Sequence, residues 1–468
     1  MTAVAPPEFA ADGPLPGVGR VMLRASAGTG KTFALSALAT RLVAEGVVPV
    51  EQLLVVTYTR AAAAELRDRV RRRLVDAVRF LADPRRWPGE PDPVLRSLLD
   101  VDREVQDRRR DRLARAVVDF DTATITTIHG FCTQVLLTLG SVGGHNPDAV
   151  LVQDTKELVT AACADALTAV VLDGTGPGTP TKLRAWVAAV LNNPGVHVVA
   201  RSGREPDLAT AELVERAARS VRDRLVGTGS ISYDGLLEAV RDALHESPAA
   251  AERLAAQFPV ALIDEFQDTD PLQWDIFRTI YTEDGVRHRD RTRLVLVGDP
   301  KQAIFAFRGG DIHTYLAAAE GADVLTLSTN WRSDGAVLRA MNALCRDWEL
   351  GDPRIRYEAV RPAPDHESRR LVGPGGGALP AVDVRCVVDV PAAAGASDAV
   401  RWSCIDDLVE RVADLLDGGA RIPGPAGGPE RDVVAQDIAV LVHANSWGPP
   451  VQRALARVGI PSVITGGS

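Results

Sequence analysis

Short apolar runs rich in leucine and β-branched residues recur along the chain, and unusual polar residues follow them. Continuous runs of this kind are typical of buried parallel strands, whose functional residues lie at the C-terminal ends. The pattern therefore predicts an α/β protein built on parallel sheet. The runs are residues 21–23, 53–58, 260–263, 294–297, 324–327 and 438–442.

Apolar residues at every fourth position predict a helix over residues 62–78. Ala62, Leu66, Val70, Leu74 and Val78 form one stripe that can pack on a sheet. The arginines between positions 67 and 73 lie mostly off this stripe, and we interpret them as a solvated helix face.

The strand pattern disappears between about residues 136 and 250, where the sequence becomes helical and rich in alanine and arginine. A helical insertion within an α/β domain is the simplest interpretation. We expect a flexible N-terminus over 1–20, a first α/β domain formed by 21–135 with 251–323, an insertion over 136–250, and a second α/β unit over 324–468.

Composition indicates a globular protein without a membrane segment. Of 468 residues, 46% are hydrophobic and 25% are charged. The net charge of −9 excludes a uniformly basic nucleic-acid-binding surface but permits a local groove. The five cysteines form no C-x-x-C pair, and we find no secretory signal and no run near the ~18 apolar residues of a membrane span. We expect a cytoplasmic protein.

The segment Ala25-Ser26-Ala27-Gly28-Thr29-Gly30-Lys31-Thr32 begins one residue after the first apolar run. Backbone N–H groups of such a loop can surround a polyphosphate, a lysine can neutralise it, and a threonine hydroxyl can hold Mg²⁺. The pattern G-x-x-x-x-G-K-[ST] has Ala25 in place of its first glycine, which leaves a simple turn before a helix as the alternative. Lysine occurs only four times in the chain, so its use here favours a nucleotide triphosphate site.

Two adjacent acids, Asp264 and Glu265, end the run at 260–263. ATP hydrolysis needs one carboxylate to hold Mg²⁺ and another group to orient the attacking water. We assign Asp264 to the metal and Glu265 to the water. The alternative is an acidic loop that caps a helix.

A second group of polar and aromatic residues follows the run at 294–297. Gln302 is placed to sense a γ-phosphate, and Arg308 carries a charge that could reach it. Phe305 and Phe307 alternate with polar residues, as base-stacking side chains do, although aromatic residues also occupy cores.

Trp331 and Arg332 follow the run at 324–327. An arginine from a second domain can contact a γ-phosphate across a cleft and make closure depend on the nucleotide. For Trp331 we weigh stacking on adenine against packing at a domain interface.

Together these segments resemble superfamily 1 DNA helicases of the UvrD/Rep class, and within that class the RecB-type subunits of exonuclease V (RecBCD) complexes. Gly130 and the pair Asp299-Pro300 favour the RecB type. The segments that match motifs I, Ia, Ib, II, III and IV of the class, in order, are 25–32, 56–63, 127–132, 264–268, 298–311 and 330–333.

The resemblance implies two RecA-like lobes that use ATP and Mg²⁺ and move 3′ to 5′ on single-stranded DNA at duplex ends, with RecC-like and RecD-like partners. It implies that Lys31 and Thr32 contact the phosphates and Mg²⁺, and that Gln302 and Arg332 contact the γ-phosphate. The residues that it assigns to DNA are Tyr58, His129 and Phe307, with Arg60 as a further candidate for the DNA backbone.

Two features depart from the family pattern. Residues 1–31 contain no glutamine to recognise adenine, and we find no candidates for motifs V and VI or for the RecB nuclease. Residues 437–442 resemble the last strand before the large insertion of the second lobe. We therefore expect the front portion of a longer helicase with little unwinding activity alone. A nucleotide-gated DNA- or protein-binding module is the alternative.

Overall fold

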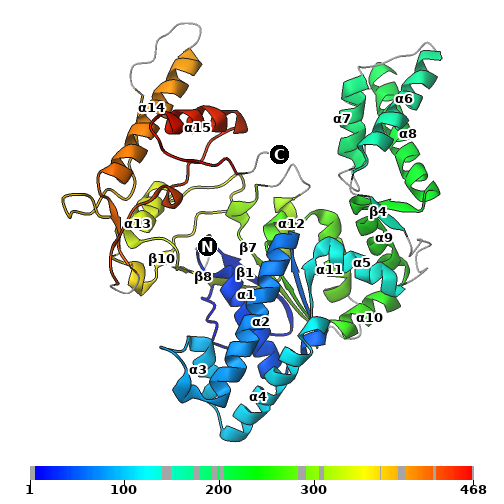
Figure 1. The fold of residues 1–468 in the computed structure, drawn as a ribbon. Helices are drawn as coiled ribbons and strands as arrows, with labels where there is room; N and C mark the ends of the chain where they lie inside the picture. Colours follow the sequence, from blue (N-terminus) through cyan, green and yellow to red (C-terminus); the bar gives the residue numbers. More distant parts are fainter. Residues whose placement is uncertain are drawn as a thin grey trace. The chain divides into compact units, whose positions relative to one another are not determined.

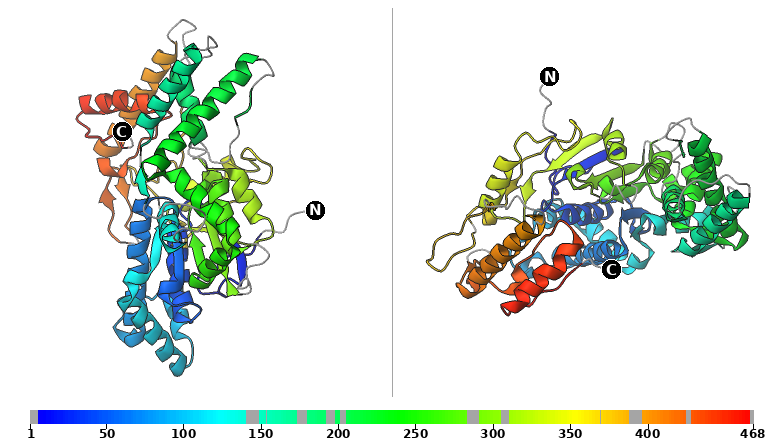
Figure 2. Two further views of the ribbon diagram at one scale, coloured as in Figure 1. Left: turned by 90° about the vertical axis from the view of Figure 1, so that its right-hand side faces the viewer. Right: turned by 90° about the horizontal axis from the view of Figure 1, so that it is seen from above.

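The computed structural model describes residues 6–139, 149–152, 154–172, 180–191, 198–200, 205–282, 291–304, 310–368, 370–387, 396–424 and 428–465. The chain forms two units, one of Met1–Leu327 with Gly351–Ile355 and the other of Ser328–Leu350 with Arg356–Ser468 (Figures 1 and 2). Phe305, Phe307 and Arg308 lie outside the described residues. In the part of the chain that is described, no helix is both long and apolar enough to cross a membrane.

A six-stranded parallel sheet forms the centre of the first unit, in the order β3-β2-β6-β7-β1-β8. Five of the strands fall on predicted apolar runs. The sixth, β3, is short and rich in threonine, and the hydrophobic pattern did not predict it. The bounds are β1 Gly19–Ala25, β2 Leu53–Thr57, β3 Thr124–Thr127, β6 Val260–Ile263, β7 Arg293–Gly298 and β8 Asp323–Leu327.

Helices cover both faces of this sheet, because alternate strand residues point to opposite sides. Val21 and Leu23 belong to one core cluster and Met22 to the other. The first face carries α1 Lys31–Ala44, α2 Arg60–Ala82, α3 Pro93–Leu99 and α4 Arg103–Val118. The second carries α5 Ile128–Leu139, α9 Tyr233–Glu246, α10 Pro248–Gln257, α11 Pro271–Tyr281 and α12 Ile312–Ala319.

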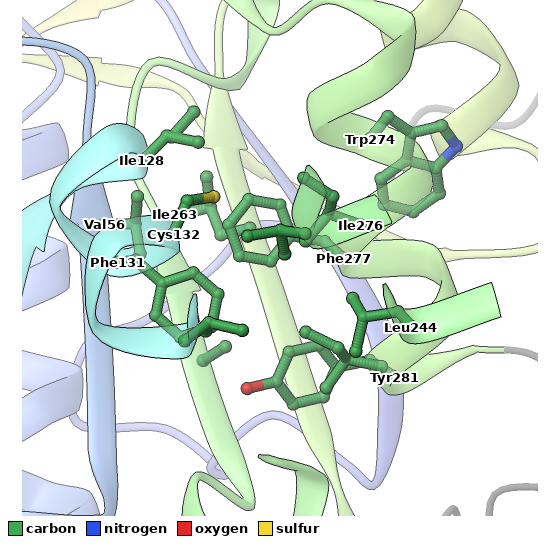
Figure 3. Close-up of a cluster of buried hydrophobic side chains, with 14 of the residues drawn as sticks. Val56, Ile128, Phe131, Cys132, Leu244, Ile263, Trp274, Ile276, Phe277 and Tyr281 are labelled. Atoms are coloured by element: carbon green, nitrogen blue, oxygen red, sulfur yellow. The ribbon is translucent and has the colours of Figure 1, made fainter. Parts of the chain in front are cut away.

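An aromatic cluster fills the core on the second face (Figure 3). The ring of Phe131 stacks on Phe277 at 5.8 Å and meets Phe258 edge-on at 6.1 Å. The buried Tyr281 hydroxyl donates to the Phe258 carbonyl oxygen at 2.9 Å, so its polar end is satisfied. This cluster holds α5, α10 and α11 together over the sheet.

The arginines of α2 are not simply a solvated face, contrary to our interpretation. Arg67 and Arg71 lie over the ring of buried Phe120, at 5.3 and 5.7 Å from its centroid. Arg73 lies 4.4 Å from the centroid of Phe33 and pairs with Asp92 at 2.9 Å. Their aliphatic stems and planar heads therefore cover aromatic surface as well as facing water.

The predicted insertion contains a separate helical core. It consists of α6 Lys156–Leu172, α7 Pro180–Leu191 and α8 Glu205–Gly227, packed around residues such as Val159, Val187 and Ala217. Two short parallel strands, β4 Val150–Val152 and β5 Ser230–Ser232, lie where we expected no strand. Helix α9 and part of α10 fall within 136–250, but their buried residues belong to the core beside the sheet.

The second unit carries small pieces of sheet. Its described strands form two pairs, β9 Thr329–Asn330 with β10 Arg361–Pro362 and β11 Arg421–Ile422 with β12 Arg431–Asp432. Its helices are α13 Gly335–Leu344, α14 Ala396–Asp417 and α15 Gly448–Arg457, and Ile405, Val412 and Leu455 are buried between the last two.

One boundary and one strand assignment that we predicted for the second unit are wrong. The run at 324–327 lies in β8, which pairs with β1 in the first unit, because the sheet edge beside β1 accepts another parallel strand. The run at 438–442 is not a strand. Ile438 and Val440 are instead half-buried against the α14–α15 core, so their apolar side chains are used without strand pairing.

Short 3-10 helices complete the described structure: η1 Val50–Gln52, η2 Pro84–Arg86, η3 Phe120–Thr122, η5 Phe266–Asp268, η7 Pro300–Gln302, η9 Pro364–His366, η11 Ala435–Asp437 and η12 Asn445–Trp447.

Candidate nucleotide-binding site and nucleic-acid interface

The glycine-rich loop connects the end of β1 to the start of α1. Gly28 and Gly30 have φ angles of 79° and 88°, a left-handed conformation that glycine adopts without strain. The Thr29 hydroxyl donates to the Ser26 carbonyl oxygen at 2.8 Å and closes the turn. The N-cap residue of α1, Gly30, has no side chain to cap the helix, which leaves the backbone N–H groups of the first turn facing the loop, where they can bind an anion.

Ala25 does not disturb this loop. It is the last residue of β1, where it is buried and pairs with Leu327 of β8. An extended strand residue needs no left-handed backbone, and an alanine methyl group fits the core there. The loop therefore forms without the first glycine of the usual pattern.

The Lys31 side chain reaches the acidic residues at the end of β6. Its Nζ lies 2.6 Å from Glu265 Oε2. Glu265 has a left-handed backbone with φ of 50°, which is strained for a residue with a side chain. The Asp264 N–H donates to the Val56 carbonyl oxygen at 2.8 Å, and the Glu265 N–H donates to Asp264 Oδ1 at 2.9 Å. These bonds hold the two acids at the sheet edge where the loop begins.

The acidic group is poorly solvated. Burial, and next the negative charge of Glu265, raises the pKa of Asp264 to about 6, while Lys31 partly opposes the shift. The same two causes raise the pKa of Asp268 to about 6. A bound cation would favour ionised carboxylates here, since it replaces the solvation that burial removes. A hydroxyl and a carboxylate are oxygen ligands of the kind that Mg²⁺ prefers, so the metal role of Thr32 and Asp264 stays a prediction.

Gln267 is a site residue to which the sequence assigned no role. Its Nε2 donates to Glu265 Oε2 at 2.8 Å, and its Oε1 accepts from the Asp299 N–H at 3.0 Å. The Asp299 carboxylate in turn accepts from Gln302 Nε2 at 2.7 Å and pairs with Lys301 Nζ at 2.8 Å. In the sequence, the only signal for this role was a glutamine two residues after the acid pair.

Three polar residues from different segments meet at the neighbouring strand ends. Arg60 begins α2, directly after β2, and donates to the Tyr233 hydroxyl at 3.2 Å. The Tyr233 ring lies edge-on to His129, with centroids 4.9 Å apart. Burial, and next the charge of Arg60, lowers the pKa of His129, so this imidazole is neutral near pH 7. The sequence predicted Arg60 and His129 as DNA contacts but gave no role to Tyr233.

Other predicted residues are not part of this group in the described structure. Tyr58 follows β2 and is half-buried. Trp331 and Arg332 belong to the second unit, where both side chains are exposed. There the Asn330 side-chain oxygen accepts from the Arg332 and Ser333 N–H groups, at 2.9 and 2.8 Å, and fixes the turn. The roles of Trp331 and Arg332 toward a nucleotide remain predictions.

Comparison with known proteins identifies relatives over most of the chain. The RecBCD enzyme subunit RecB of Mycolicibacterium smegmatis is 38% identical over 472 residues, which are 97% of this chain and 41% of that protein. The subunit of the same name from Mycobacterium tuberculosis is 38% identical over 474 residues, with the same two shares. That of Escherichia coli is 28% identical over 593 residues, with shares of 96% and 48%.

This chain spans less than half the length of these relatives. Residues 14–323 match the UvrD/REP helicase N-terminal domain, a range that contains the phosphate loop, the acid pair and the Arg60–Tyr233–His129 group. The chain therefore belongs to the UvrD/REP helicase family.

Proposed function

We propose that this chain supplies the ATP-binding part of a 3′–5′ DNA helicase subunit that acts in double-strand break repair and recombination. The observation that carries the proposal is the 2.6 Å pair between Lys31 of the phosphate loop and Glu265 at the end of β6. It joins a cation suited to a terminal phosphate with a carboxylate suited to orient water. Sequence similarity to RecB subunits of RecBCD enzymes supports DNA as the substrate along which the chain moves, and RecC-like and RecD-like chains as its partners.

In this proposal each residue at the strand ends has one task in ATP hydrolysis. The N–H groups of 26–32 and the Lys31 ammonium bind the phosphates. Thr32 and Asp264 hold Mg²⁺, which draws charge from the phosphate oxygens when it is bound. Glu265 orients the attacking water, and Gln302 and Arg332 respond to the γ-phosphate. Trp331 stacks on adenine, and Arg308 adds positive charge near the phosphates.

DNA would lie across the strand ends beside the nucleotide. Arg60 contributes charge toward the phosphate backbone, and neutral His129 contributes a hydrogen bond or a stacking surface. Tyr233 contacts both residues and holds their side chains in place. Tyr58, Phe305 and Phe307 complete the proposed surface. We propose that the units built from 21–327 and from 328 onward act as the two lobes of the motor.

The test is ATP turnover by the 468-residue chain, measured with and without single-stranded DNA and accompanied by a strand-separation assay. We expect nucleotide binding, DNA-stimulated hydrolysis and little unwinding without additional chains. Binding of nucleotide and DNA without any hydrolysis would instead identify a nucleotide-gated binding module. Absence of nucleotide binding would refute the proposal.

A further inference from the structure

Both polar atoms of the Gln267 side-chain amide form hydrogen bonds within the first unit. The residue is 2% exposed. Its nitrogen donates to Glu265 Oε2 at 2.8 Å, and its oxygen accepts from the Asp299 N–H at 3.0 Å. A buried amide with two such bonds is fixed in one orientation, because rotation would leave a buried polar group unpaired.

The hydrogen bond from the Asp299 N–H links the Gln267 amide to the segment that follows β7. Asp299 is 2% exposed, and its carboxylate holds Lys301 and Gln302. One amide therefore joins the acid at the end of β6 to the turn that carries Gln302. A movement of that turn changes the position of the Asp299 N–H and, through the amide, the position of the Glu265 carboxylate.

Gly298 provides the space that the amide occupies. A Cβ atom at this position would lie 2.7 Å from Gln267 Oε1 and 3.2 Å from the Gln267 backbone nitrogen. Real Cβ atoms do not approach other atoms at 2.7 Å, so even alanine would displace the amide. This close approach gives a second, independent way to disturb the same contact.

We propose that Gln267 is a positioning residue that couples the segment 299–302 to the Glu265 carboxylate, so that DNA bound near this segment sets the rate of hydrolysis. The inference rests on the proposed function. When Lys31 turns from Glu265 to a phosphate, the Gln267 amide still donates to Oε2 and so fixes the orientation of the carboxylate that positions the water. Gln267 makes no contact with the reacting atoms and acts through Glu265.

The first test compares Gln267→Ala and Gly298→Ala with the control Gln273→Ala. Gln273 is also a buried glutamine, 5% exposed on α11, and its Oε1 has no hydrogen-bond partner among the described residues. We measure turnover over a range of ATP and single-stranded DNA concentrations, together with the affinity for a fluorescent ATP analogue. We expect DNA-stimulated kcat to fall about ten-fold or more in both test variants, while KM and analogue affinity change less than about three-fold. The control should match the wild type.

A second readout does not depend on turnover. Hydrogen exchange of peptides covering 299–304 is measured with and without a non-hydrolysable ATP analogue and Mg²⁺. In the wild type we expect the nucleotide to slow exchange in this segment, and in Gln267→Ala we expect this response to be lost although the analogue still binds.

Wild-type stimulation by DNA in Gln267→Ala, or an unchanged exchange response, would overturn the coupling role. A loss of analogue affinity equal to the loss of kcat would also overturn it, because it would assign Gln267 to binding. If the wild-type chain binds no nucleotide, the proposed function itself fails, and this outcome is distinct from the three above.

Discussion

Lys31 Nζ and Glu265 Oε2 lie 2.6 Å apart although 234 positions separate the two residues in the chain. The lysine is the first residue of α1, and the glutamate follows β6, a strand that is not adjacent to β1 in the sheet. Without a nucleotide, the two charges neutralise each other. A bound phosphate must therefore replace a carboxylate as the partner of the lysine.

Replacing Glu265 with glutamine separates binding from hydrolysis. Glu265→Gln removes the negative charge that competes with phosphate for Lys31, so we expect nucleotide affinity to stay the same or rise. We expect DNA-stimulated turnover to fall by about 10²–10⁴-fold, because the water loses its orienting base. Fluorescent-nucleotide titration and steady-state ATPase assays measure the two effects.

Lysine variants provide the control for that experiment. Lys31→Ala should abolish detectable nucleotide binding, whereas Lys156→Ala should not change it, because Lys156 is an exposed lysine with 89% of its side chain accessible. Turnover that persists in Glu265→Gln would show that another group orients the water.

Arg60 and His129 should affect DNA binding in different ways. Arg60→Gln removes a positive charge, so we expect weaker DNA binding. When the logarithm of the binding constant is plotted against the logarithm of the salt concentration, the slope should be smaller in magnitude by about one. His129→Ala removes a neutral ring, so we expect weaker binding with the same slope. Fluorescence anisotropy with a labelled oligonucleotide at several salt concentrations measures both quantities. Arg72→Gln, an exposed position on the same helix, is the control, and an equal change of slope in this variant would contradict the role of Arg60.

Asp234 makes stability depend on pH. Burial, and next the charges of Asp270 and Glu238, raises its pKa from 3.8 to about 6. Because the folded-state pKa is the higher one, folding favours the protonated acid, and this contribution is lost as the pH rises through about 6. Asp234→Asn keeps a neutral side chain, so we expect its Tm to exceed that of the wild type at pH 8 by about 2–4 °C.

This Tm difference should shrink below pH 5, where the wild-type acid is protonated. Thermal unfolding at pH 4.5, 6 and 8 measures it. Asp242→Asn on the same helix, at a carboxylate paired with Arg241 on the surface, is the control. A Tm difference independent of pH would show that Asp234 does not titrate in this range.

Phe131 lies on α5 two residues after His129 and packs in the core on the second face of the sheet. Phe131→Ala should cost about 3–5 kcal/mol of folding free energy, because it removes a ring with 0% exposure that packs on Phe258 and Phe277. Phe131→Leu should cost less, because it keeps more of the buried volume. Denaturant titration measures both, and equal costs would argue against the ring packing as the cause.

The sequence by itself determined most of the sheet, and it predicted the two segments of the candidate site that the fold brings together at Lys31 and Glu265. Apolar runs of three to six residues located β1, β2, β6, β7 and β8, since a strand packed between two layers of helices leaves a local apolar signature. The phosphate loop and the acid pair were also readable, because each is a short segment whose residue types follow directly from phosphate and metal chemistry.

Tertiary structure decided which segments meet. Strand β3 lacks an apolar run and is held in the sheet by its pairing with β2. The run at 438–442 packs apolar side chains against α14 and α15 without forming a strand. The contacts of Gln267 with Asp299 and of Tyr233 with Arg60 join positions 32 and 173 residues apart. Periodicity and motif spacing report what each segment can bury or bind, whereas strand order and helix packing determine its partner. The sequence therefore predicted Lys31 and Glu265 as members of one site, and only the folded sheet placed Gln267 between Glu265 and Asp299.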